Sequence, residues 1–354
     1  MIPIAACIIA ILITNLFWPQ INQGLQIHFH GKTYLINAAY FYVLVFLPFY
    51  LIYAFQFSTS ADYYNYSIMY IKIGNGIHAI KEPLIYIIFK LVSMFRLDFQ
   101  FVYFFIYGIA FLILYKTLTF YSRDITFSMI MLTCVFFALT LHQIRQLLAV
   151  VFSFVSYRYI YEKKFIKFLL FVVIASICHV SALIMLPAYF LLRYRHKLSD
   201  IIILSCGCII LGKVAKKIVP FLIRHFVPSR IDWYNNFKYA GFSKWDLILL
   251  TIFVILLLIY YRRVVNEQIN KIFIHAFIIY MVLFFFCRWI PEVKRWGYYY
   301  FFPIIALIPN CLTEEKNKTV RLFYSFTVLL YLFVYLMVAY RGALNIYSFR
   351  LLFK

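Results

Sequence analysis

The chain has 354 residues, of which 66% are hydrophobic and only 13% are charged. A soluble globular protein has about 45–50% apolar and roughly 25% charged residues, so this composition excludes a soluble fold. The formal charge of +22 comes from basic residues scattered through short loops. That pattern favours anionic lipid headgroups and phosphate-bearing lipids as partners, and it argues against nucleic acid.

Long apolar runs recur from one end of the chain to the other. A helix needs about 20 apolar residues to cross a hydrocarbon core of roughly 30 Å, whereas a barrel strand needs only about 10 alternating residues. The sequence therefore predicts an all-α, polytopic transmembrane helical bundle of about twelve spans, forming a single domain over 1–354. The expected spans are 3–18, 35–55, 99–119, 125–141, 146–160, 165–178, 181–192, 200–219, 246–261, 271–287, 297–310 and 320–340.

The first long connection, 56–98, contains charged residues, a tyrosine cluster and a helix-start signal in addition to joining two expected spans. Asp62 opens a cluster of tyrosines, and further on Glu82 is followed by Pro83. Proline at the first helical position is a signal for the start of a helix. The apolar stretch that follows is too short to span the membrane, so we expect a short interfacial or re-entrant helix near 83–95.

Two later connections are also unusual. Segment 213–245 holds seven Lys or Arg residues, and in 288–296 a proline interrupts the helical pattern between two arginines. With the N-terminus outside, the basic turns YEKKFIK (161–167) and RYRHK (193–197) face the cytoplasm, as the positive-inside rule prefers. The same alternation makes 56–98, 213–245 and 288–296 extracytoplasmic loops.

Titratable and charged side chains gather on this outer face. Placing a charged side chain at membrane depth costs at least ~2.5–3.5 kcal/mol of free energy, so charged side chains beside apolar runs indicate functional residues. The alternative is that each arginine snorkels to the headgroups and each carboxylate is a solvated loop residue. The residues concerned are Asp62, Glu82, His142, Arg145, His179, Arg288 and Arg295.

Two of these positions invite specific chemistry. Arg145 lies within one helical turn of His142 and Gln146, and its planar guanidinium can bind a phosphate. His179 lies in a long apolar run, where it is either a satisfied core residue or a general base near neutral pH. No Walker A, GxSxG, HExxH or Rossmann motif is present, so we expect no ATPase, no hydrolase triad, no metal and no cofactor.

Four segments together resemble one family. They are ADYYNYSIMYIKI (61–73), KEPLIYIIFKL (81–91), the run HQIRQLL to AYFLL (142–192) and CRWIPEVKRWGYYYFFPI (287–304). These segments are similar to the EpsG family of bacterial membrane proteins, which is related to Wzy-type oligosaccharide repeat-unit polymerases. The stretch FQFSTSAD (55–62) departs from the family pattern, in which an Arg and a Gly precede the Asp.

The resemblance implies a GT-C-like helical fold in the bacterial cytoplasmic (inner) membrane. It also implies a glycosyltransferase that polymerises undecaprenyl-diphosphate-linked oligosaccharide repeat units of a surface polysaccharide: O-antigen, capsule or exopolysaccharide. Membrane lipids and the chain-length regulator and flippase of the same pathway are the expected partners. Two alternatives remain, namely an exporter of polysaccharide or lipid-linked sugar, and a membrane glycan ligase or acyltransferase.

Such a reaction needs fixed positive charge for the leaving diphosphate and a base for the attacking sugar hydroxyl. We expect Arg145, Arg288 and Arg295 to line one cavity and bind the diphosphate. As the base we rank His179 first and Glu82 second, with Asp62 as a positioning residue. The residues expected to contact or position the sugar are Tyr63, Tyr66, His142 and Gln146.

Overall fold

The computed structural model describes residues 9, 25–29, 32–36, 39–57, 61–193, 210, 214, 218, 220–222, 224–225, 243–287, 291–339 and 348–349. The chain divides into two compact units. The first unit is Met1–Val151, Ile177–His179 and Glu315–Lys354, and the second is Phe152–Ser176 and Val180–Glu314. The expectation of one domain over 1–354 was made from the sequence and stays a prediction.

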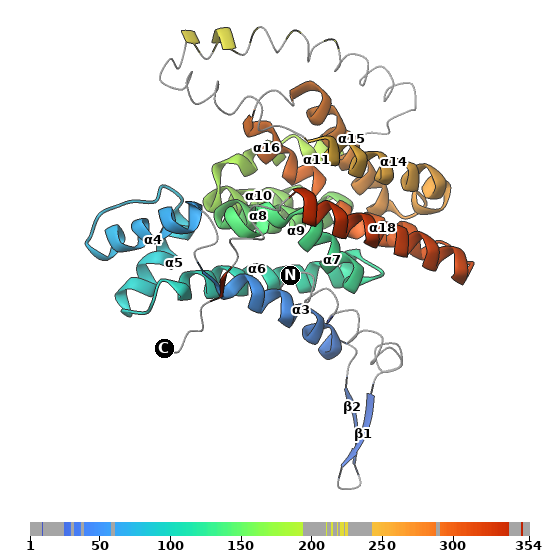
Figure 1. The fold of residues 1–354 in the computed structure, drawn as a ribbon, viewed down its shortest axis with the longest axis horizontal. Helices are drawn as coiled ribbons and strands as arrows, with labels where there is room; N and C mark the ends of the chain where they lie inside the picture. Colours follow the sequence, from blue (N-terminus) through green and yellow to red (C-terminus); the bar gives the residue numbers. More distant parts are fainter. Residues whose placement is uncertain are drawn as a thin grey trace. The chain divides into compact units, whose positions relative to one another are not determined.

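The first unit is a set of helices with two short antiparallel strand pairs. In β1 and β2, Leu25 lies opposite Ile36, and in β3 and β4, Gln56 lies opposite Phe349. Helix α3 lies along α6, and α4 lies beside α5 (Figure 1). The elements are β1 (Leu25–Phe29), β2 (Lys32–Ile36), α3 (Ala39–Ala54), β3 (Gln56–Phe57), α4 (Ala61–Gly74), α5 (Pro83–Met94), α6 (Gln100–Tyr121), α7 (Ile125–Val135), α8 (Phe137–His142), α18 (Lys318–Ala339) and β4 (Ser348–Phe349).

Helix α9 (Ile144–Tyr161) runs from the first unit into the second. In the second unit α15 packs on α16 and α17, and α14 packs on α17. A capping box starts α14, because the Ser243 side chain accepts from the backbone of Asp246 and Asp246 accepts from the backbone of Ser243. The other elements are α10 (Phe165–Cys178), the 3₁₀ helix η1 (Val180–Met185), α11 (Ala188–Leu191), α14 (Lys244–Val264), α15 (Gln268–Cys287), α16 (Pro291–Phe301) and α17 (Ile304–Thr313).

The helices have the length and composition of a membrane protein. Within the part of the chain that the structure describes, four stretches are long and apolar enough to cross a bilayer, namely Gln100–Tyr121, Lys244–Val264, Gln268–Phe285 and Lys318–Val338. Shorter apolar helices, including Val45–Ala54 and Phe165–Cys178, accompany them. The protein is therefore an all-α membrane protein, while the number of about twelve spans and the GT-C-like arrangement remain predictions. The expected spans at 3–18 and 200–219 lie almost entirely outside the described residues.

Three expected spans are interrupted. The span at 125–141 divides into α7 and α8 at Phe136, where the sequence has neither Gly nor Pro to announce a break. The spans at 181–192 and 297–310 divide near Pro187 and Pro303, because proline lacks an N–H and clashes with the preceding turn. His179 lies at a further break, between α10, which ends at Cys178, and η1, which begins at Val180.

The predicted short helix near 83–95 is present as α5, and Glu82 occupies its N-cap position. Its placement at the membrane interface stays a prediction. Most of the segment 213–245, as well as residues 288–290, lies outside the described residues.

Candidate functional site

Glu82 holds the position just before α5, with Pro83 as the first helical residue. Residues at this N-cap position usually turn their side chain back to accept from the first backbone N–H groups. Glu82 has extended backbone angles and makes no such bond. Its carboxylate points instead to side chains from two other segments, so capping does not account for a glutamate here.

Arg145 is the main partner of that carboxylate. It is the second residue of α9, and its Nη1 donates to both Oε1 and Oε2 of Glu82, each at 2.9 Å. Its Nε donates to the Tyr66 hydroxyl at 3.3 Å, and its guanidinium lies 5.5 Å from the centre of the Tyr66 ring. The side chains of Arg145 and Glu82 are 28% and 12% exposed, so the ion pair is partly buried but can still be reached.

His179 completes the cluster. It lies in the break between α10 and η1, and its Nδ1 is 3.2 Å from Glu82 Oε1. An ionised carboxylate accepts but cannot donate, so Nδ1 carries the hydrogen of this bond and Nε2 is left as an acceptor whenever the ring is neutral. The side chain is 23% exposed.

Glu82 is held as a carboxylate. Burial alone would raise its pKa, but the hydrogen bond with His179 and the charge of Arg145 outweigh burial and lower the pKa to about 2. A carboxylate with so low a pKa is a weak proton acceptor near neutral pH. Glu82 is therefore suited to orient Arg145 and His179.

Further polar groups border this cluster. Asp62, at the start of α4, lies close enough to Tyr66 and His142 for its negative charge to interact electrostatically with both side chains. Within the described part of the chain, His142 Nδ1 and Gln143 Oε1 are buried without a hydrogen-bond partner. A buried polar atom without a partner is costly, and a ligand that hydrogen-bonds to it removes that cost.

The remaining predicted residues lie elsewhere. The Tyr63 hydroxyl donates to Gln100 Oε1 at 3.3 Å, and its ring stacks on Tyr103, so Tyr63 packs in the core beside the cluster. Gln146 is buried in α9. Arg295 is exposed on α16 of the second unit, and Arg288 lies outside the described residues. The shared arginine cavity thus stays a prediction.

Sequence reasoning missed two buried glutamines that support the neighbouring helices. Gln100 Nε2 donates to the Ala54 carbonyl at 2.5 Å, and Gln56 Nε2 donates to the Tyr107 hydroxyl at 2.7 Å. Tyr107 in turn donates to the Thr140 carbonyl. An amide beside an apolar run was the available signal, because a polar group at membrane depth needs a partner.

Among the described residues, no group of three or more His, Cys, Asp or Glu side chains could hold a metal ion. In comparisons with known proteins, the model of the EpsG family matches residues 39–351. No curated protein and no solved structure matches the chain.

Proposed function

Since the chain belongs to the EpsG family, we propose that this membrane protein is a glycosyltransferase that polymerises lipid-linked oligosaccharide repeat units of a surface polysaccharide. One observation carries the proposal. Arg145 and His179 lie 63 and 97 residues from Glu82 in the sequence, yet both contact its carboxylate. An anion-binding group and a proton acceptor are the two parts that transfer from a lipid diphosphate requires.

Arg145 binds the diphosphate of the donor in this proposal. Its contacts with Glu82 and Tyr66 use Nη1 and Nε, and the side chain is 28% exposed, so a diphosphate can meet the Nη2 end of the guanidinium. Glu82 and Tyr66 fix the direction of that end before the donor arrives. A guanidinium oriented in advance stabilises the charge that develops on the leaving group without reorganising during the reaction.

His179 acts as the base. Glu82 accepts the hydrogen of Nδ1 and thereby turns Nε2 outward as the proton acceptor. Glu82 also stabilises the imidazolium that forms, because the carboxylate stays ionised. Glu82 is thus a positioning residue, whereas the sequence alone left it as the second candidate for the base.

The step balances without a cofactor. The hydroxyl oxygen of one repeat unit attacks the anomeric carbon of another, and a new glycosidic C–O bond forms. The bond between that carbon and the diphosphate oxygen breaks, and the lipid diphosphate leaves with the electron pair. The hydroxyl proton moves to Nε2 of His179. Asp62, His142 and Gln143 border the cluster and are the candidates to bind sugar hydroxyls.

The test is chain growth by the full-length protein in lipid vesicles supplied with undecaprenyl-diphosphate-linked repeat units. We expect the wild type to make a ladder of longer glycans and Arg145→Ala to make none. Arg158→Ala is the matched control, because Arg158 lies on the same helix in an exposed pair with Glu162. This variant should polymerise normally. Transfer only to a different acceptor, or transport without bond formation, would contradict the proposal and favour a ligase or an exporter.

The side of the membrane is tested separately. The reaction is proposed to occur outside the cytoplasm, where the sequence places His142, Arg145 and His179. In a cysteine-free background, a membrane-impermeant thiol reagent added to intact cells should label Gln143→Cys and leave Lys164→Cys unlabelled. The reverse pattern would overturn the orientation.

A further inference from the structure

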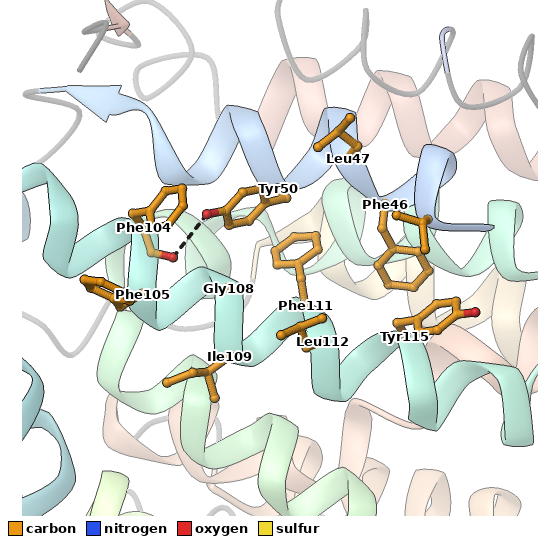
Figure 2. A pocket seen from close by; sticks show the side chains of 11 residues that line it. Phe46, Leu47, Tyr50, Phe104, Phe105, Gly108, Ile109, Phe111, Leu112 and Tyr115 are labelled. Carbon is orange, nitrogen blue, oxygen red and sulfur yellow. Dashed lines mark hydrogen bonds between the residues drawn. The ribbon is translucent and has the colours of Figure 1, made fainter. Parts of the chain in front are cut away.

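An apolar groove runs between α3 and α6 in the first unit (Figure 2). Its volume is about 450 Å³, within the range of about 300–1,000 Å³ that is usual for ligand sites. Six of its lining residues carry aromatic rings: Phe46, Tyr50, Phe104, Phe105, Phe111 and Tyr115. The Tyr50 hydroxyl donates to the Phe104 carbonyl at 3.3 Å, so this hydroxyl is already paired.

The surroundings of the groove restrict the chemistry of its occupant. Helix α6 is one of the helices able to cross the membrane, so the groove lies along a membrane-spanning segment. Its rim residues Val43, Leu47 and Leu112 are 49%, 44% and 66% exposed, so the groove is open on the outer surface of α3 and α6. A site that opens into hydrocarbon and offers almost only apolar surface selects a hydrocarbon chain.

One end of the groove is linked to the candidate site by a chain of side-chain contacts through α6 and α4. Phe104 lines one end of the groove, and the preceding residue, Tyr103, stacks on Tyr63 with ring centres 5.3 Å apart. Tyr63 lies on α4, the helix that also carries Tyr66, whose hydroxyl accepts from Arg145. From Phe104 to Tyr115 the groove follows α6 for about 16 Å, at 1.5 Å per residue.

A glycine keeps the groove open. Gly108 lies midway along its α6 wall, and a Cβ added there would meet only the Tyr50 ring, at 4.0 Å. A larger side chain at this position therefore has room for its first carbon and must extend into the groove beyond it. Figure 2 shows Gly108 between Phe104 and Phe111 on this wall.

We infer that the groove between α3 and α6 holds the first part of the isoprenoid chain of the lipid-linked donor while Arg145 holds its diphosphate. The inference rests on the proposed function, because it takes the donor to be a lipid diphosphate. The aromatic rings that line the groove offer apolar surface to the methyl branches of an isoprenoid chain. The groove would thus align the donor as well as anchor it.

Photolabelling tests the inference without requiring catalysis. The probe is a polyisoprenyl diphosphate with a diazirine near the diphosphate end of its chain, added to the full-length protein in nanodiscs. We expect label in the peptides that contain 43–50 and 104–115, displaced by unlabelled polyisoprenyl diphosphate and not by excess phosphatidylglycerol. Equal displacement by phosphatidylglycerol would overturn the inference, as would even labelling of α14 and α18, whose Leu258 and Leu322 are 71% and 68% exposed.

A groove-filling variant makes the test sharper. Gly108→Phe should lower the groove label at least tenfold, whereas Leu258→Phe, on an exposed face of α14, should leave it unchanged. Wild-type labelling of a folded Gly108→Phe protein would contradict the inference. If this variant does not fold, the competition experiment on the wild type still decides.

The two proposals fail in different ways. If polymer grows but the photoprobe does not label the peptides of the groove, only the isoprenoid site is wrong. If the groove is labelled specifically and no polymer grows, the polymerase proposal is wrong and the lipid site stands.

Discussion

Each unit of the protein contains a polar cluster, and the two clusters are built differently. In the second unit Asn310 donates to Asn270 at 2.8 Å and Asn270 donates to Glu267 at 2.7 Å, with both asparagines only 1% exposed. In the first unit the cluster joins Arg145, Glu82 and His179, and these side chains are 12–28% exposed.

The difference distinguishes polar groups that stabilise the fold from polar groups that are placed to bind a ligand. The buried asparagine amides are satisfied by each other and by Glu267, which is how buried polar groups stabilise a helix bundle. The cluster around Glu82 places full charges where a ligand can reach them, which costs more and yields no better packing. Exposure and charge together, more than polarity alone, mark the candidate site.

Among the changes that compare the two units, His179→Ala is expected to have the largest effect. A base that takes a proton in the transition state contributes about 10²–10⁴-fold, so the polymerisation rate should fall by that amount while the melting temperature stays close to that of the wild type. His275→Ala is the matched change in the second unit, where His275 hydrogen-bonds to the Leu192 carbonyl at 2.8 Å. It should lower the melting temperature and leave kcat unchanged. If His179→Ala lowered the melting temperature and His275→Ala lowered kcat, the comparison between the two units would be wrong.

The second largest effect is from Glu82→Gln. The amide can still accept from His179 but loses the charge that holds Arg145, and a hydrogen bond to a charged group is worth about 1.5–3 kcal/mol. Since about 1.4 kcal/mol corresponds to a factor of ten, kcat should fall roughly tenfold to a hundredfold.

A double variant shows whether Glu82 acts through its partners. Glu82→Gln combined with Arg145→Ala should lose less than the product of the two separate losses, because the part of its effect that Glu82 exerts through Arg145 is gone once Arg145 is absent. Fully multiplied losses would mean that Glu82 does not act through Arg145.

A third change addresses the second unit. Asn310→Ala leaves Asn270 without its donor, and an unsatisfied buried group costs about 1–3 kcal/mol. We expect a lower denaturation midpoint in detergent and normal activity per folded molecule. Ser176→Ala removes an exposed bond to the Val173 carbonyl and should change neither quantity. Lost activity in a stable Asn310→Ala protein would show that the second network also serves the reaction.

The smallest effect is on the pH dependence of stability. The pKa of Glu82 is lowered to about 2 from its ordinary 4.5, so the ion pair contributes fully above pH 4.5 and is lost as pH falls towards 2. Melting temperatures of the wild type should therefore change little between pH 7 and pH 5 on account of this group. Below pH 4.5 the wild type should lose stability more steeply than Glu82→Gln. Parallel curves would show that the pair is not formed in the resting protein.

The sequence predicted the helices better than their ends. The expected span at 99–119 is α6, the one at 165–178 is α10, and Pro83 correctly announced the start of α5. The break at Phe136 carried no local signal, because the stretch 125–141 contains neither Gly nor Pro. A run of apolar residues predicts burial in a membrane, but it does not say whether the helix continues.

The sequence predicted the residues of the candidate site and a cavity shared by three arginines, but it did not predict that Glu82 pairs with Arg145 and His179. Glu82, Arg145 and His179 were each chosen because a charged or titratable group beside an apolar run needs a reason. Their pairing depends on contacts across 63 and 97 residues, for which a single sequence gives no register. The low pKa of Glu82 follows from that pairing, so the sequence could not separate the proposed base, His179, from Glu82, the residue proposed to position it.

The position of Glu82 early in the chain also bears on biogenesis. Chains are synthesised from the N-terminus, so Tyr66 and Glu82 have already left the ribosome when Arg145 emerges, and His179 follows last. The acceptors for the guanidinium are thus made before the charge that needs them. The membrane-insertion machinery never has to hold Arg145 beside hydrocarbon while its partners are still untranslated.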